Sequence, residues 1–278
     1  WLHEGFATFY ALLAEREIFG DDYYYWKLYQ SAEQLKELSD QGKGEKVTKA
    51  NASSLTYYQK GAWALHILRE KVGKEAFNTA VKNYLEQYKF KTATTSNFIA
   101  EVEAAANVDL SDFMAKWLNQ TAFQGFAALN SLKNSEFIKK HLEILALRET
   151  PLEKKEEVLS AALDFPVSDY TGQEVVYQLA GETSETAIKL YKKAFETNNI
   201  YVRQAIASSI ERIPKQLKSE FESLLNDESY LTKEVALLKL WMNFPQEVST
   251  YLDKTKGITG FTNKNVRMLW LTLNLITP

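Results

Sequence analysis

The sequence predicts an all-α protein, and three features of its pattern lead to this prediction. Apolar residues recur at three- and four-residue intervals along most of the 278 residues, which places them on one face of a helix. No stretch shows the strict apolar and polar alternation of a half-buried strand. From Glu136 onward, short helical pieces are separated by prolines, which is typical of stacked helices with short connections.

The first 54 residues predict two helices and a long loop. The first helix carries one apolar stripe and ends at Gly20, and the second begins at a capping Asp21 or Asp22 and reaches about Leu38. Residues 39–54 are polar and contain two glycines, which indicates a surface loop. Long loops of this kind often border active sites.

Four further helices are expected before residue 124. Their positions follow from apolar spacing and from capping residues: residues 58–73, a helix around 77–85, one capped by Thr95 or Ser96, and one capped by Asp109. Small and polar residues cluster at 125–131. We therefore predict two domains, residues 1–126 and residues 127–278.

The second predicted domain has a weak internal repeat. Pro214 and Pro245 each follow a similar helix and lie 31 residues apart, and Val235 and Val266 have the same separation. Repeats of this length, filled by paired helices, are typical of an α-solenoid, in which each repeat buries its apolar face against its neighbours. A HEAT-like or armadillo-like solenoid is the prediction for this domain.

Composition excludes several classes of function. The net charge of −3 provides no basic surface for nucleic acid or for an anionic membrane. The chain has no cysteine, so disulfides, a thiolate nucleophile and a Cys-ligated zinc site are excluded. No apolar run approaches the roughly 20 residues that span a bilayer. We expect a soluble protein with no nucleic-acid or membrane partner; cytoplasm and periplasm both stay open, as does the oligomeric state.

Two short motifs stand out: residues 1–7 read Trp-Leu-His-Glu-Gly-Phe-Ala and residues 58–62 read Tyr-Gln-Lys-Gly-Ala. Together they resemble the aminopeptidase N family of zinc metallopeptidases, which are gluzincins. The family has Trp-Leu-Asn-Glu-Gly-Phe-Ala and, some fifty residues later, Tyr-Glu-Lys-Gly-Ala. The order, spacing and helical context match, and His3 and Gln59 are the two departures from the family pattern.

The resemblance assigns a role to one residue in each motif. It implies that Glu4 is a zinc ligand and that Tyr58 is the catalytic phenol that stabilises the tetrahedral intermediate. It also implies a peptide substrate cleaved at its N-terminus by zinc-bound water, and a first domain that is the helical half of a thermolysin-like catalytic domain.

The family's His-Glu-x-x-His motif, which supplies two zinc ligands and the general base, is absent. The three histidines are His3, His66 and His141, and no two are four residues apart. We therefore expect a C-terminal fragment that begins just after this motif, with upstream chain covering Trp1. Because a lone carboxylate binds zinc weakly, the fragment itself is predicted to hold no zinc tightly and to be inactive.

Each assignment has an alternative that requires no catalysis. Glu4 can be an acidic residue favoured by the dipole of a helix start, and Tyr58 can be an aromatic core residue. Adjacent helical residues point about 100° apart, so His3 is not expected to share a metal with Glu4, and His66 is expected to be hydrogen-bonded and partly buried. For the whole chain, a non-catalytic peptidase relative and a helical-repeat protein-binding module are the alternatives.

Overall fold

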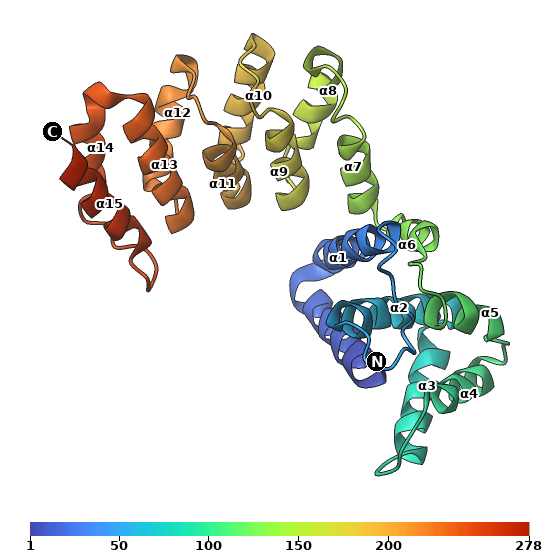
Figure 1. Ribbon diagram of the computed structural model, residues 1–278. Coiled ribbons are helices and arrows are strands. Elements are labelled where there is room, and N and C mark those ends of the chain that lie inside the picture. The colour runs from blue at the N-terminus through green and yellow to red at the C-terminus, as the bar shows by residue number, and fades with distance from the viewer. Residues whose placement is uncertain (278) are drawn as a thin grey trace. The chain divides into compact units, whose positions relative to one another are not determined.

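The computed structural model describes residues 1–277, and all regular structure in this range is helical. The prediction of an all-α fold is thereby confirmed. The chain divides into two compact units, residues 1–139 and residues 140–278, each of which has helices of its own packed on one another (Figure 1). The division falls within the helix α7 (Glu136–Leu145).

The first unit is built around one long helix. This helix, α1 (Leu2–Asp40), packs against the segments that follow the first loop. The other helical segments of the first unit are η1 (Thr56–Lys60), α2 (Gly61–Val72), α3 (Lys74–Gln87), α4 (Thr95–Ala106), α5 (Ser111–Phe113), η2 (Met114–Leu118) and α6 (Gly125–Leu132). Both η1 and η2 are π-helical. Fully buried aromatic side chains, among them Phe9, Tyr24 and Trp63, form the core between α1 and α2.

Gly20 interrupts α1 as the sequence predicts. It has φ 87° and ψ 177°, a conformation that is accessible almost only to glycine. Helical residues continue directly on both sides, so the two predicted helices are two segments of one element joined at a kink. Neither predicted aspartate cap is formed: α1 continues through both residues, and Asp21 accepts two hydrogen bonds from Arg16 at 2.7 and 2.9 Å.

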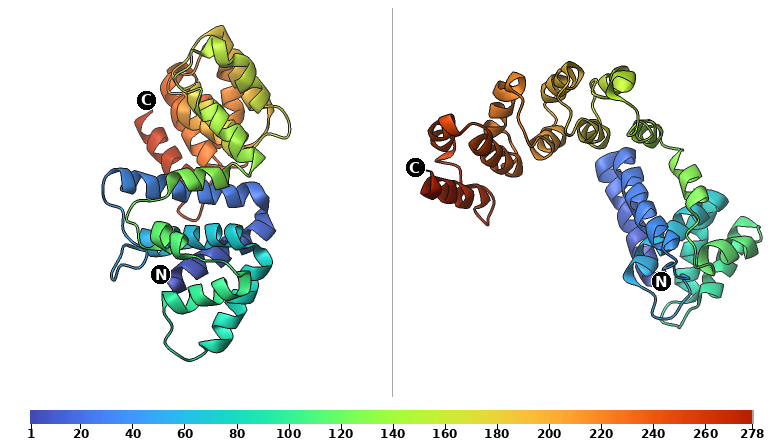
Figure 2. Two further views of the ribbon diagram at one scale, coloured as in Figure 1. Left: turned by 90° about the vertical axis from the view of Figure 1, so that its right-hand side faces the viewer. Right: turned by 45° about the horizontal axis from the view of Figure 1, so that its top comes forward.

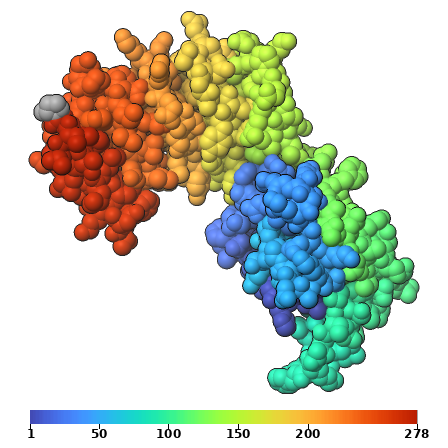
Figure 3. All heavy atoms as spheres, in the orientation of Figure 1, coloured from blue at the N-terminus to red at the C-terminus, as the bar shows by residue number. Residues whose placement is uncertain are grey.

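The hairpin of α3 and α4 projects from the first unit (Figure 3). The cap of α4 is Thr94, one residue before the predicted caps, and it forms a capping box with Asn97. In this reciprocal arrangement each side chain bonds the other residue's backbone N–H. The turn before Thr94 exposes Phe90, which is 97% accessible.

The second unit consists of two rows of helices (Figures 1 and 2). One row contains α7, α9 (Asp169–Gln178), α11 (Ile200–Ser209), α13 (Tyr230–Asn243) and α15 (Asn265–Ile276), and the other contains α8 (Leu152–Ala162), α10 (Glu185–Glu196), α12 (Lys218–Ser223) and α14 (Val248–Thr255). From α9 to α15, each helix of the first row packs on the next one in that row. One continuous apolar core lies between the rows. This order is the one that a solenoid requires; the HEAT-like assignment stays a prediction.

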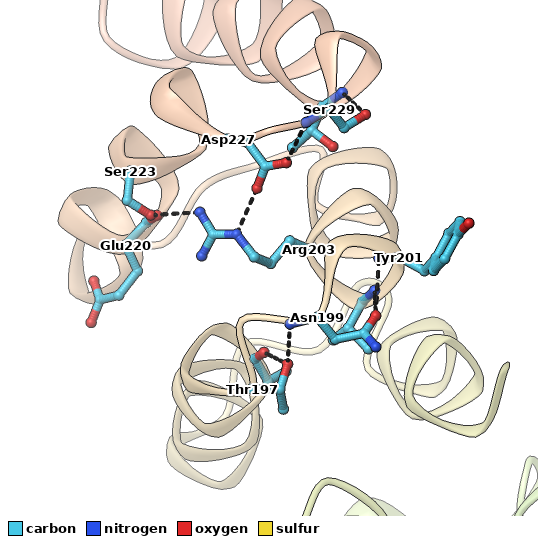
Figure 4. Close-up of polar contacts among 11 residues, drawn as sticks. Thr197, Asn199, Tyr201, Arg203, Glu220, Ser223, Asp227 and Ser229 are labelled. Atoms are coloured by element: carbon cyan, nitrogen blue, oxygen red, sulfur yellow. Dashed lines mark hydrogen bonds and ion pairs between the residues drawn. The ribbon is translucent and has the colours of Figure 1, made fainter. Parts of the chain in front are cut away.

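Polar contacts also join successive repeats of the second unit (Figure 4). Arg203 of α11 binds the buried Asp227 before α13, with Nε and Oδ2 2.6 Å apart, and also donates to Ser223 Oγ at 3.2 Å. The side chain of Asn199 accepts from the backbone N–H groups of Tyr201 and Val202, which caps α11. These contacts satisfy charged and backbone groups that packing would otherwise leave without partners.

Candidate functional site

The segments that carry the two sequence motifs cross at a pair of glycines. A Cβ atom on Gly5 would lie 3.1 Å from the carbonyl carbon of Gly61, and a Cβ atom on Gly61 would lie 3.1 Å from the Cα of Gly5. Such a close approach of two backbones requires residues without side chains. Glu4 is the neighbour of one glycine and Tyr58 lies three residues, about one helical turn, before the other. The crossing therefore brings together the backbones of the two motifs.

Glu4 lies in the first turn of α1 and is partly accessible. Its side chain is 35% exposed. A hydrogen bond from its own backbone N–H lowers the pKa of Glu4. The carboxylate is therefore ionised at neutral pH, as a metal ligand must be.

Tyr58 is the middle residue of the π-helical segment η1. The side chain is 45% exposed, so the alternative that Tyr58 is a core residue is wrong. Its hydroxyl has no hydrogen-bond partner among residues 1–277, whereas the hydroxyl of the preceding Tyr57 donates to Lys49 O at 2.7 Å. Single π-helical turns are rare and occur often at functional sites. Tyr58 thus presents a free phenol on a π-helical turn.

The described residues do not form a metal site by themselves. Within residues 1–277 there is no group of three His, Asp or Glu side chains arranged to hold a metal ion. Catalytic zinc sites in proteins use three protein ligands, and Glu4 can supply one of them. The side chains present thus do not fit a complete zinc site.

A cavity of the first unit lies beside α1, between its first turns and the α3–α4 hairpin. It has a volume of about 1200 Å³ and is lined by aromatic residues such as Phe6, Tyr84 and Phe90. His3 lines this cavity, but Glu4 and Tyr58 do not. The indole of Trp1 also lines it and is only 6% exposed, with Nε1 donating to Thr95 Oγ1 at 3.0 Å. Residues of the first unit thus cover most of the Trp1 indole; the expectation of upstream chain over Trp1 stays a prediction.

Comparison with known proteins identifies the family of this region. Residues 1–117 match the sequence model of the peptidase family M1 domain. These residues belong to peptidase family M1. The M1 match includes Glu4, the Gly5–Gly61 crossing and Tyr58, and it ends within η2.

Individual relatives of the M1 segment are aminopeptidases by name. Glutamyl aminopeptidase of Bos taurus is 38% identical over 79 residues, which are 28% of this chain and 8% of the relative. Aminopeptidase N of Escherichia coli is 35% identical over 71 residues, 26% of this chain and 8% of the relative. The "Probable aminopeptidase 1" of Sulfurisphaera tokodaii is 26% identical over 163 residues, 55% of this chain and 21% of the relative. The chain thus spans about a fifth or less of these relatives. No solved structure matches it significantly.

Two residues near Tyr58 were not assigned from the sequence. Lys60, which is part of the M1 motif, is 2% exposed, and its ammonium donates to three backbone carbonyl oxygens. Glu45 lies in the first loop, and its carboxylate accepts from Ser53 N at 2.7 Å and from Thr56 Oγ1 at 3.2 Å. Lys60 belongs to the second sequence motif, but no signal in the sequence indicated that Glu45 and residues 120–121 contact its side chain.

No described helix combines the length and the apolar character needed to cross a membrane. The prediction of no membrane partner rests on the sequence arguments given above.

Proposed function

We propose that this chain is part of a zinc-dependent aminopeptidase that removes N-terminal residues from peptides. The crossing at Gly5 and Gly61 carries the proposal, because it puts the segment of Glu4 against the segment of Tyr58. The M1 match of residues 1–117 and the names of the relatives support the same activity. In this proposal, residues 1–126 are the helical half of the catalytic domain.

Glu4 is proposed as one of three zinc ligands, with the other two supplied by residues outside the described chain. Bound zinc in a peptidase supplies an acidified water as the nucleophile. The carboxylate of Glu4 suits this role because it is ionised and partly accessible. Because a single carboxylate holds zinc weakly, the 278-residue chain alone is proposed to be inactive.

Tyr58 is proposed to stabilise the tetrahedral intermediate of peptide hydrolysis. The carbonyl oxygen of the scissile bond gains negative charge as the intermediate forms, and a phenol can donate a hydrogen bond to it. The free hydroxyl and the 45% exposure of Tyr58 allow such contact. No rearrangement of a competing hydrogen bond is needed.

The change Tyr58→Phe in the full-length gene product tests this function. Removing one oxyanion donor slows an enzyme by about a hundredfold to a thousandfold, so we expect a loss of kcat of this size in an aminopeptidase assay with added zinc. The 278-residue chain, assayed in the same way, is expected to show no activity.

Tyr201→Phe is a matched control, because Tyr201 is 49% exposed and lies in the second unit. Its kcat should equal that of the unmodified protein. Full turnover by the Tyr58→Phe protein would refute the role of Tyr58. A full-length protein that shows no zinc-dependent turnover would instead favour a non-catalytic peptidase relative or a binding module.

A further inference from the structure

The π-helical segment that carries Tyr58 is held at both ends by a single loop residue. At its first residue, Thr56 Oγ1 donates to the carboxylate of Glu45 at 3.2 Å. At its last residue, Lys60 Nζ donates to the backbone carbonyl of Glu45 at 2.6 Å. π-helical segments are rare and occur mostly as single turns within α-helices, so contacts at both ends favour this register over an α-helical one. Glu45 supplies contacts of this kind at both ends.

Lys60 also ties the loop to a third part of the chain. Its ammonium donates to Gln120 O at 2.8 Å and to Thr121 O at 3.0 Å, just after the second π-helical segment. The same two loops touch at Gly44, where a Cβ atom would lie 2.4 Å from Thr121 O. Three carbonyls from two loops therefore converge on one buried cation.

The charges of both groups agree with this geometry. The ammonium of Lys49 and the backbone N–H of Ser53 lower the pKa of Glu45 to about 2, so its carboxylate stays ionised. Burial lowers the pKa of Lys60 to about 8, and the charge of Glu45 opposes this effect. Below pH 8 the ammonium thus keeps three protons to donate to its three carbonyl partners.

We propose that Lys60 is a positioning residue for Tyr58: by binding three carbonyl oxygens from two loops, it holds the π-helical register that directs the Tyr58 phenol outward. Lys60 and Tyr58 are two residues apart, so they leave the helix on different sides. One side chain anchors the segment while the other stays free. The inference deepens the proposed function of Tyr58 and rests on it for its catalytic consequence.

The first test measures the position of Tyr58 without catalysis. The 278-residue chain is labelled with 3-fluorotyrosine, and its ¹⁹F signal for Tyr58 is assigned from the spectrum of the Tyr58→Phe variant. Lys60→Met keeps the apolar stem but cannot donate, so we expect the Tyr58 signal to shift. An unchanged Tyr58 signal in Lys60→Met would overturn the proposal.

Lys155→Met is the matched control. Lys155 is 3% exposed and likewise donates to two carbonyls, Leu147 O and Arg148 O, but it belongs to the second unit. Its loss should lower stability and leave the Tyr58 signal in place. If Lys60→Met does not fold, Lys60→Gln replaces it, because the shorter amide can donate but cannot reach all three carbonyl oxygens. A Tyr58 signal that is unmoved by Lys60→Gln would then overturn the proposal.

The second test uses turnover by the full-length gene product. Lys60→Met should lower kcat at least tenfold with KM within about twofold, since an oxyanion donor acts mainly in the transition state. The double variant with Tyr58→Phe should be no slower than Tyr58→Phe alone, because both changes remove the same contribution, the hydrogen bond from Tyr58 to the oxyanion. A double variant slowed by the product of the two single effects would contradict the proposal. If Tyr58→Phe has no effect, the catalytic role fails, while the ¹⁹F result still decides whether Lys60 positions Tyr58.

Discussion

His66 is enclosed in the first unit, where both of its ring nitrogens have hydrogen-bond partners. The hydroxyl of Tyr24 lies 2.9 Å from Nδ1 and that of Ser131 lies 2.7 Å from Nε2. The sequence predicts a hydrogen-bonded His66, and the structure adds that it is 4% exposed. Burial lowers the pKa of His66 to about 3, and the positive charges of Arg69 and Arg16 act in the same direction. His66 therefore holds α1, α2 and α6 together as a neutral ring.

This pKa predicts a dependence of stability on pH. In the unfolded chain a histidine binds a proton below about pH 6.5, whereas folded His66 stays neutral to about pH 3. Between these values the unfolded state binds more protons, so the free energy of unfolding falls as the pH is lowered. At about pH 4.5 the contribution of His66 should lower the free energy of unfolding by roughly 2–3 kcal/mol relative to pH 7.

Urea unfolding at both pH values measures this effect. His66→Gln replaces the titrating ring by a polar side chain that does not titrate, and we expect its pH dependence to be weaker by this amount. The exposed His3→Gln removes a histidine without disturbing the core and serves as the control. Equal pH dependence in the unmodified chain and in His66→Gln would contradict the prediction.

At the scale of the elements, the contact between α1 and α2 depends on two residues that have no side chain. A methyl group at Gly5 or Gly61 would meet the backbone of the other helix at 3.1 Å. The backbone of a packed helix yields little, so the helices must move apart and their neighbours must repack. The geometry of the proposed site is thus coupled to stability.

We expect Gly5→Ala and Gly61→Ala each to lower the free energy of unfolding by about 1–3 kcal/mol. The double variant should lose less than the sum, since one displacement makes room for both methyl groups. Urea denaturation measures all three. Gly257→Ala is the control, because a Cβ atom there has no neighbour within 4 Å. Additive losses would show that the two glycines do not share one contact.

Buried lysines stabilise helix ends in the second unit. Lys155 donates to Leu147 O and Arg148 O just beyond α7, and Lys239 donates to Ser208 O at the end of α11 at 2.7 Å. The last carbonyls of a helix have no partner within the helix and attract cations. The lysine of one helix therefore satisfies the end of an earlier one in the stack.

At the scale of the whole molecule, each compact unit has a core of its own. Leu65 in the first unit and Leu237 in the second are both 0% exposed. Truncating a buried leucine to alanine costs about 2–5 kcal/mol. The units should respond separately, because a domain with its own core can unfold independently.

We predict that Leu65→Ala lowers hydrogen-exchange protection only in residues 1–139, and that Leu237→Ala lowers it only in residues 140–278. Mass spectrometry of peptides from both variants measures this, and each variant is the control for the other. A loss of protection across both units in either variant would show that they unfold together.

The sequence by itself determined the helical character of the chain, the break at Gly20 and the two motifs of the M1 segment. These features depend on residues close together in the chain, such as the spacing of apolar positions or the backbone freedom of one glycine. The contact of Gly5 with Gly61, the three carbonyls around Lys60 and the exposure of Tyr58 were decided only by the tertiary structure. The first two join segments more than ten residues apart, and the exposure of Tyr58 depends on which distant segments cover it; local spacing contains no information on which distant backbones pack together.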